Sequence, residues 1–213
     1  MASAETQPQH RGKSRAYLVM RAEAEEALRL AREWWEHKTV PPYVKVRQLR
    51  KDELEEFVRL YNRCFIASPD PFCPISLEDA QKLDTDGIFV AEMWGTLVGF
   101  IACFVERDKD PIYGEITGLG VLPSRRRRGV ATALIQRAVE YFLEAGVKEV
   151  YCEVYEENTP SKMLVMGYGF KQVGRREIPW EAPPEALDEA PGGKIMRKFG
   201  LRPRPGCRNC RDI

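Results

Sequence analysis

The residues most suited to chemistry lie between Gly114 and Ala131, where four consecutive arginines precede a glycine. The pattern predicts a strand, a turn at Pro123, the arginine run, and a helix that Gly129 opens. The first N–H groups of a helix have no partner within it, and with the helix dipole they attract anions. Gly129 lets a large ligand approach the backbone, and arginines pair well with phosphate oxygens. The segment therefore predicts a pyrophosphate-binding site.

Two common phosphate-binding motifs are absent from this loop. It has no GxxxxGK followed by Ser or Thr, which excludes a P-loop, and no GxGxxG, which argues against a dinucleotide-binding turn. A solvated basic loop or a nucleic-acid contact is the alternative for the arginine run. The flanking strand, glycine and helix favour the pyrophosphate, although four arginines cannot all face one such group.

The spacing of Arg126, Gly129 and Ala131 matches the pattern (Gln or Arg, two residues, Gly, one residue, Gly or Ala) that opens the long helix of the GNAT superfamily. The chain resembles these acyl-CoA-dependent N-acetyltransferases from about Tyr43 to Phe199, and Asn158 and Gly169-Phe170 strengthen the resemblance. The resemblance implies an α/β fold whose mixed, mostly antiparallel sheet is flanked by helices. It also implies acetyl-CoA as co-substrate and no metal ion. The implied cofactor-binding residues are Leu119, Gly120, Val121, Arg126, Arg127, Arg128, Gly129, Val130, Ala131 and Asn158.

The resemblance also implies how these residues act. Backbone amides from Arg126 to Ala131 would hold the CoA pyrophosphate, and the main chains of Leu119 and Val121 would bind the pantetheine arm. The Leu119 N–H would polarise the thioester carbonyl, in the manner of an oxyanion hole. Asn158 would contact the CoA arm.

Acetyl transfer to an amine needs a base, because an ammonium must lose a proton before its nitrogen attacks a thioester. Glu115 falls where histone acetyltransferases of this superfamily carry their catalytic glutamate, and Glu153 is a second, weaker candidate. The alternative for Glu115 is a strand glutamate that faces solvent or pairs with a lysine. Many members carry a general-acid tyrosine seven residues after the asparagine, but here that position is Val165. Tyr168 is expected to face elsewhere.

Hydrophobic periodicity predicts the elements that position these residues. Expected helices cover 16–38, a segment capped by Asp52, a short segment capped by Ser76, 129–146 and 160–166. Expected strands cover 44–46, 88–93, 96–105, 112–121, 149–155, 169–174 and 194–199, with a hairpin turn at Trp94-Gly95. The domain division expected is a disordered 1–15, an N-terminal helix extension 16–42, an acetyltransferase domain 43–200 and a basic tail 201–213.

Composition and net charge limit the classes of partner that we expect for this chain. The formal net charge of +1 sets up no strong field for nucleic acid, which is therefore not expected as a partner. No apolar window is long enough to span a bilayer and residues 1–15 lack a signal-peptide core, so a cytoplasmic protein without a membrane partner is expected. Cys207 and Cys210 form a single CxxC pair, which alone is a weak metal signal.

These observations predict an enzyme that transfers acetyl from acetyl-CoA to an amine of a protein, peptide or small molecule, by direct attack in a ternary complex. The acidic residues between Glu177 and Pro191 would favour a cationic acceptor, or form only a solvated loop. The alternative function is a non-catalytic acyl-CoA-binding module, which the missing tyrosine motivates. The resemblance allows a homodimer, but no residue specifies its interface.

Overall fold

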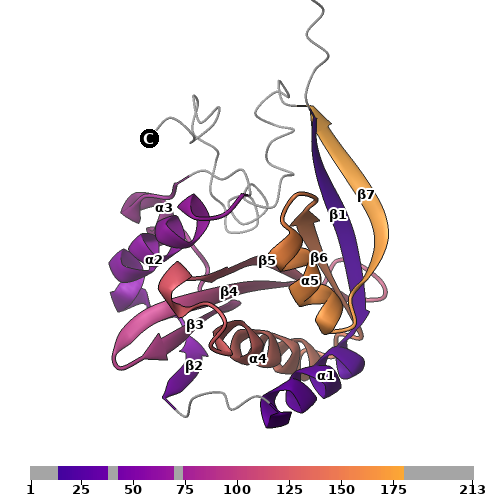
Figure 1. Cartoon of the computed structure of the whole chain (residues 1–213), viewed down its shortest axis with the longest axis horizontal. Helices are drawn as coiled ribbons and strands as arrows, with labels where there is room; N and C mark the ends of the chain where they lie inside the picture. The colour runs from indigo at the N-terminus through magenta and orange to yellow at the C-terminus, as the bar shows by residue number, and fades with distance from the viewer. Residues whose placement is uncertain (1–13, 38–42, 70–73, 180–213) are drawn as a thin grey trace, which may run out of the picture.

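A seven-stranded sheet forms the centre of the protein in the computed structural model, which describes residues 14–37, 43–69 and 74–179 (Figure 1). The strands are β1 (Ser14–Glu23), β2 (Val44–Gln48), β3 (Ile88–Met93), β4 (Thr96–Glu106), β5 (Tyr113–Val121), β6 (Glu149–Tyr155) and β7 (Lys171–Pro179). Their order across the sheet is β2-β3-β4-β5-β6-β1-β7. Every neighbouring pair is antiparallel except β5–β6, which is parallel. The expected mixed, mostly antiparallel sheet is confirmed.

Helices cover both faces of this sheet. They are α1 (Ala24–His37), α2 (Leu54–Ile66), α3 (Leu77–Gln81), α4 (Val130–Glu144) and α5 (Thr159–Gly167). A Cβ on Gly99 would meet Val130 and Leu134 of α4, whereas a Cβ on Gly120 would meet Cys64 of α2. Gly99 and Gly120 lie on neighbouring strands, one residue out of register, so they face opposite ways. Helices α2 and α4 therefore cover opposite faces, and α1 packs along α4 (Figure 1).

The long helix α4 begins and ends where the sequence predicts. Gly129 precedes it with a φ of 76°, a backbone conformation that glycine adopts without strain. Gly146 follows it with the same φ, and the Val147 N–H donates to the Phe142 carbonyl, which closes the helix in a Schellman motif. The buried face of the helix carries Leu134, Ala138 and Phe142, among other apolar residues.

The N-terminal segment differs from its prediction. A helix is expected over 16–38, but Ser14–Glu23 forms β1, which lies between β6 and β7 and is antiparallel to both. Only Ala24–His37 is helical. The physical reason is that the unbroken apolar run Ala16–Met20 suits a central strand buried on both faces, and pairing with β6 and β7 satisfies its backbone groups. The sheet therefore includes residues on the N-terminal side of the boundary expected at Tyr43, as well as Ser14 and Arg15 of the segment expected to be disordered.

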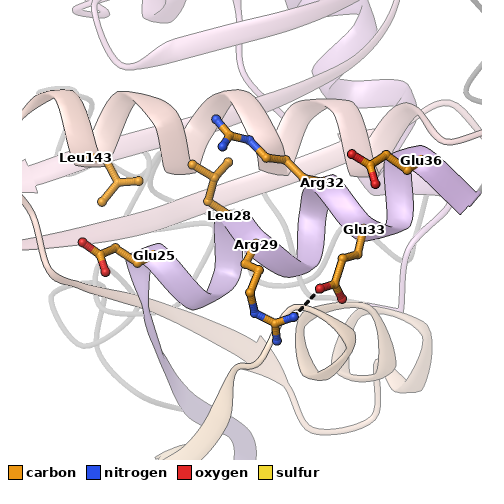
Figure 2. Close-up of a pocket in the computed structure, with 7 residues that line it drawn as sticks. All are labelled: Glu25, Leu28, Arg29, Arg32, Glu33, Glu36 and Leu143. Atoms are coloured by element: carbon orange, nitrogen blue, oxygen red, sulfur yellow. Dashed lines mark hydrogen bonds and ion pairs between the residues drawn. The ribbon is translucent and has the colours of Figure 1, made fainter.

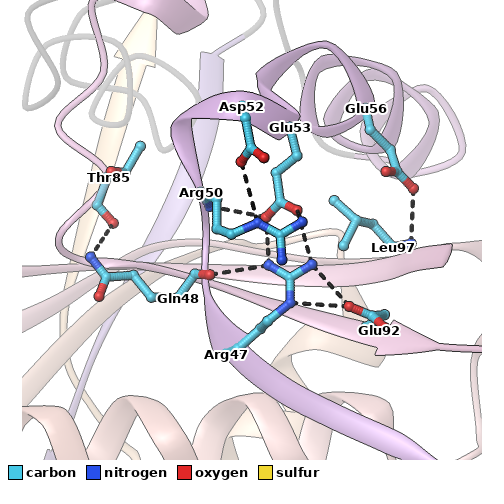
Figure 3. Close-up of polar contacts among 9 residues, drawn as sticks. All are labelled: Arg47, Gln48, Arg50, Asp52, Glu53, Glu56, Thr85, Glu92 and Leu97. Atoms are coloured by element: carbon cyan, nitrogen blue, oxygen red, sulfur yellow. Dashed lines mark hydrogen bonds and ion pairs between the residues drawn. The ribbon is translucent and has the colours of Figure 1, made fainter. Parts of the chain in front are cut away.

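The start of α2 also differs. Asp52 is expected to cap this helix, but it lies in a 3₁₀ turn (Lys51–Glu53), and α2 begins after Glu53. The Glu53 carboxylate is buried and accepts hydrogen bonds from Arg47 Nη1 at 2.6 Å and Nη2 at 2.9 Å (Figure 3). Arg47 also contacts Glu92 of β3 at 2.9 Å. An ion-pair cluster, rather than a side-chain cap, thus fixes α2 to β2 and β3.

The cluster shifts the ionisation of its members. Burial by itself would raise the pKa of Glu53, but the hydrogen bond from Arg47 and the Arg50 backbone N–H together hold that pKa below its usual value. The hydrogen bond to Glu53 in turn raises the pKa of Arg47. Both groups therefore stay charged at neutral pH.

Other predicted local features are observed. Ser76 and Asp79 form a reciprocal capping box at α3. Trp94 and Gly95 form the β3–β4 hairpin turn with φ values of 50° and 75°. The strand expected over 194–199, the basic tail and Cys207 and Cys210 lie outside the described residues. Among the helices that the structure describes, none is both long and apolar enough to cross a membrane.

Candidate active site

The parallel strands β5 and β6 separate part of the way along their length. They pair only from Gly114–Val150 to Ile116–Cys152. Beyond Ile116, β5 continues to Val121 alongside β4, while β6 continues alongside β1. The strands therefore diverge, and the edge of β5 from residues 117 to 121 turns its backbone groups toward the opening. We call this opening the β5–β6 split.

The arginine loop and the first turn of α4 border the split where β5 ends. Pro123–Arg125 form a 3₁₀ turn, and Arg127 and Gly129 have φ values of 61° and 76°. The Ala133 N–H donates to the Gly129 carbonyl. The N–H groups that precede Ala133 in this turn have no acceptor within the helix and are suited to an anion. The backbone of the predicted pyrophosphate site thus has the geometry that the sequence implies.

The arginine side chains divide into different roles. The Arg126 Nε donates to the Val121 carbonyl at 3.1 Å and ties the loop to β5. The Arg125 guanidinium lies 5.7 Å from the centre of the Trp94 ring, on the β3–β4 hairpin. Arg127 and Arg128 are exposed. Arg125 is therefore directed at the Trp94 ring, which agrees with the expectation that four arginines cannot all face one pyrophosphate.

Two predicted cofactor-binding residues also have a packing role. Asn158 is buried and caps α5, since its Oδ1 accepts from the Ser161 N–H at 3.1 Å. Its Nδ2 donates to Ser68 Oγ at 3.5 Å, so the cap lies beside the end of α2. A Cβ on Gly120 would lie 2.5 Å from the Phe100 ring, so close packing alone requires glycine there. Nothing in the sequence near Asn158 indicated Ser68, ninety residues away.

Glu115 lies at the closed end of the split. It is one residue before the last β5–β6 pair, with Phe104 of β4 and Tyr151 of β6 on either side in register. The side chain of Gly114 would point at Phe142 of α4, so the side chain of Glu115 points to the opposite face of the sheet. Its exposure is 6%. A buried carboxylate at the point where two strands diverge is suited to act on a group that enters between them.

Glu153 is held by an ion pair. It follows Tyr151 by two residues and therefore shares its face of β6. Nη2 of Arg176, on β7, donates a hydrogen bond to the Glu153 carboxylate. Strand β1 lies between the two strands, with its Val19 opposite Glu153. Sequence reasoning did not find this partner, which lies two strands away. This ion pair ties Glu153 to β7, two strands away.

The structure places both Val165 and the nearby Tyr168 in the hydrophobic core. Val165, at the position where the resemblance to the GNAT superfamily led us to expect a general-acid tyrosine, is buried in the core. Tyr168 is also buried, and its hydroxyl donates to Thr132 Oγ1 at 2.7 Å. Burial raises the pKa of Tyr168, with a smaller opposing effect from that hydrogen bond. Neither residue is a general acid at the split, and the Tyr168–Thr132 contact was not predicted.

Buried thiols offer no nucleophile. Cys64, Cys103 and Cys152 are buried and form no disulfide bond with one another. Burial raises the pKa of Cys64 to about 12 and raises that of Cys103 as well, which keeps both protonated. Within the described residues, no group of three or more His, Cys, Asp or Glu side chains could hold a metal ion. Of the acidic residues expected near the acceptor, the described part of the chain contains Glu177, which pairs with Arg175.

A groove elsewhere on the surface has no catalytic character. About 360 Å³ in volume, it lies between α1 and the end of α4 (Figure 2). Its lining combines Leu28 and Leu143 with charges of both signs, including the Arg29–Glu33 ion pair. Leu143 is about 20 Å along α4 from the helix start, at 1.5 Å per residue. The groove is therefore remote from the split.

Comparison with known proteins identifies the family. Residues 54–170, more than half of the chain, match the model of the acetyltransferase (GNAT) family, and the chain belongs to it. An uncharacterized N-acetyltransferase of Archaeoglobus fulgidus is 35% identical over 118 residues, 49% of this chain and 78% of that protein. An N-alpha-acetyltransferase of Sulfurisphaera tokodaii is 28% identical over 138 residues, 61% of this chain and 81% of that protein. The chain is an acyltransferase of the N-acetyltransferase class.

A solved structure supports the fold. The aminoglycoside N-acetyltransferase AAC(6')-Iy in complex with CoA superposes with a TM-score of 0.54 and 27% identity, over 62% of this chain and 91% of that one. Strand β1 and helix α1 lie outside the residues matched by the family model.

Proposed function

We propose that the protein transfers an acetyl group from acetyl-CoA to a primary amine, by direct attack of the amine within a ternary complex. One observation carries this proposal: the buried carboxylate of Glu115 lies at the closed end of the β5–β6 split, while the first amides of α4, which have no acceptor within the helix, lie at its open end. An extended ligand with an anion at one end and a reactive group at the other fits this arrangement.

Acetyl-CoA is such a ligand. The pyrophosphate binds the amides from Arg127 to Ala131, since the Arg126 N–H donates to the Pro123 carbonyl at 3.3 Å, and the exposed side chains of Arg127 and Arg128 pair with phosphate oxygens. The pantetheine arm lies along Leu119, Gly120 and Val121 and hydrogen-bonds to the open backbone edge of β5. Val130 and Asn158 complete the proposed acetyl-CoA site in the β5–β6 split. The CoA in the solved relative supports this choice of co-substrate.

The proposed chemistry follows from what surrounds the thioester. Glu115 accepts a proton from the acceptor ammonium, directly or through a water, and frees the nitrogen lone pair. The nitrogen attacks the carbonyl carbon, and the Leu119 N–H stabilises the oxyanion. Collapse expels the thiolate of CoA while the nitrogen, now bonded to the carbonyl carbon, loses its second proton to water; water protonates the thiolate because Val165 offers no acid. Cys64 and Cys103, buried and protonated, take no part, and the proposed transfer passes through no acetyl-enzyme.

The acceptor is an amine of a protein, peptide or small molecule. Relatives named as an N-alpha-acetyltransferase and as an aminoglycoside acetyltransferase support both classes. The face of the sheet that carries Glu115 also carries Tyr151 and Tyr155, whose aromatic rings are suited to a cationic amine, while Glu153 on the same face is ion-paired with Arg176.

The experiment measures thiol release from acetyl-CoA with four acceptor pools: peptides with free N-termini, peptides with internal lysines, polyamines and amino acids. Wild type is compared with Glu115→Gln and with Glu144→Gln, a matched change at the exposed end of α4. We expect release with one pool, a loss of about 10²- to 10⁴-fold in Glu115→Gln, and no change in Glu144→Gln. Equal rates for all three chains would remove Glu115 as the base. CoA binding without release from any pool would favour the non-catalytic module.

A further inference from the structure

Each side of the β5–β6 split leads into a helix. Strand β5 continues through the arginine loop into α4, and β6 continues through Asn158 into α5. Since the two strands stop pairing at Ile116 and Cys152, the sheet itself does not fix the width of the split beyond that point. Contacts between α4 and the segment that follows β6 help to do so on one face of the sheet, and the Asn158–Ser68 hydrogen bond lies on the side of α2.

One buried hydrogen bond joins the two sides. The hydroxyl of Tyr168, at the end of α5, donates to Oγ1 of Thr132 at 2.7 Å. Thr132 is the third residue of α4 and belongs to the turn whose amides face the open end of the split. Tyr168 is 4% exposed and Thr132 is 8% exposed, so water competes little for either hydroxyl.

Helix α1 supports this bond from outside. It packs along α4, and its Trp34 Nε1 donates to the Gly167 carbonyl at 3.3 Å, next to Tyr168. A Cβ on Gly169 would lie 3.1 Å from Leu30 Cδ1, so α1 also sits closely against the turn that follows Tyr168. With α1 behind them, α4 and the end of α5 have little freedom to move sideways, and the hydrogen bond can fix their separation.

We infer that Tyr168 and Thr132 are positioning residues for acetyl-CoA, whose hydrogen bond sets the width of the β5–β6 split. Neither residue belongs to the site that the sequence predicts. The inference rests on the proposed function, because it requires the split to bind the CoA arm.

The kinetic consequence is specific. The pyrophosphate and pantetheine arm do not change during acetyl transfer, so contacts with them stabilise the ground state and the transition state equally. Widening the split weakens both states alike, which raises KM for acetyl-CoA and leaves kcat nearly unchanged. The net value of one neutral hydrogen bond corresponds to about a two- to tenfold effect.

The test compares five variants of the full chain, including the double variant Tyr168→Phe/Thr132→Val. Tyr168→Phe and Thr132→Val each remove the hydrogen bond with little change of shape, and Thr132→Ser keeps a hydroxyl. Tyr141→Phe is the matched control, since Tyr141 lies near the other end of α4. Steady-state kinetics give KM and kcat, calorimetry gives the Kd for CoA, and thermal denaturation gives Tm without ligand.

We expect KM and Kd to rise about two- to tenfold in Tyr168→Phe and in Thr132→Val, with kcat within about twofold. The double variant should equal either single one, because both remove the same bond. Thr132→Ser and Tyr141→Phe should keep the wild-type KM.

Three results would overturn the inference. A lower Tm with unchanged KM and Kd would make the bond purely structural, while the proposed function stands. A fall in kcat with unchanged KM would assign the hydroxyl to the chemistry instead. Wild-type chain that binds no CoA would refute the proposed function, and this inference with it.

Discussion

Replacing Glu53 by Gln tests how the scaffold holds α2 over β5. The Glu53 carboxylate, 7% exposed, accepts two hydrogen bonds from Arg47 and one from the Arg50 N–H (Figure 3). The substitution keeps the shape and one acceptor oxygen but removes the charge. Arg47, 27% exposed, then keeps only Glu92 as an anionic partner among the contacts shown.

The magnitude follows from burial. Breaking a fully buried ion pair costs about 3–5 kcal/mol. Here Arg47 is partly solvated and keeps Glu92, and Gln still accepts a hydrogen bond, so the expected loss is about 2–3 kcal/mol. For a chain of this size each kcal/mol moves Tm by about 2–4 °C, which gives a fall of about 4–12 °C.

The effect should depend on pH with a definite sign. The pKa of Glu53 is lowered in the folded state, so its contribution is complete above the ordinary carboxyl value of 4.5. It disappears as the pH falls through the lowered folded pKa. The Tm difference between wild type and Glu53→Gln should therefore be full at neutral pH and should shrink once the pH falls below about 4.5.

Thermal denaturation by circular dichroism, from neutral to acidic pH, measures both quantities. Glu55→Gln is the control, because Glu55 pairs with Arg59 on the exposed face of the same helix and should change stability by less than about 0.5 kcal/mol. Equal Tm values for Glu53→Gln and Glu55→Gln at neutral pH would refute the reasoning. So would a Tm difference that does not vary with pH.

Three further predictions concern packing, backbone and thiol chemistry. Gly114→Ala should lower stability by about 1–3 kcal/mol in chemical denaturation, since its Cβ would lie 2.5 Å from the Phe142 ring. Gly129→Ala should lower the free energy of unfolding by about 1–2 kcal/mol because of its φ of 76°, and should raise KM for acetyl-CoA. Gly167→Ala, whose Cβ would lie in open space, should change neither quantity. Cys64 should resist iodoacetamide at about pH 8 in the native chain and react in denaturant, as peptide mass mapping would detect; rapid native labelling would contradict its burial.

The sequence predicted features that depend on local conformation. The start and end of α4 follow from two glycines and an amphipathic pattern, and the hairpin at Trp94-Gly95 follows from turn geometry. The arginine loop belongs to the same class, because strand, loop and helix are contiguous in the chain. Each of these features is determined within a few residues.

Features that depend on pairing across the sheet could not be predicted in the same way. The run Ala16–Met20 fits a buried helix or a buried strand, and only pairing with β6 and β7 selects the strand. Arg176 pairs with Glu153, 23 residues away in the sequence, and Tyr168 donates a hydrogen bond to Thr132, 36 residues away. Such contacts depend on register and strand order, and these partners carry no sequence motif.

The most direct test of the central claim follows the acetyl group itself. The chain is mixed with acetyl-CoA labelled with carbon-13 in the acetyl group, with and without the active acceptor pool, and intact masses are measured for chain and acceptor. Direct attack with Glu115 as the base predicts labelled acetyl on the acceptor amine, none on the chain in either mixture, and almost none on the acceptor when Glu115→Gln replaces wild type. Labelled acetyl bound covalently to the chain, or wild-type transfer that persists fully in Glu115→Gln, would contradict it.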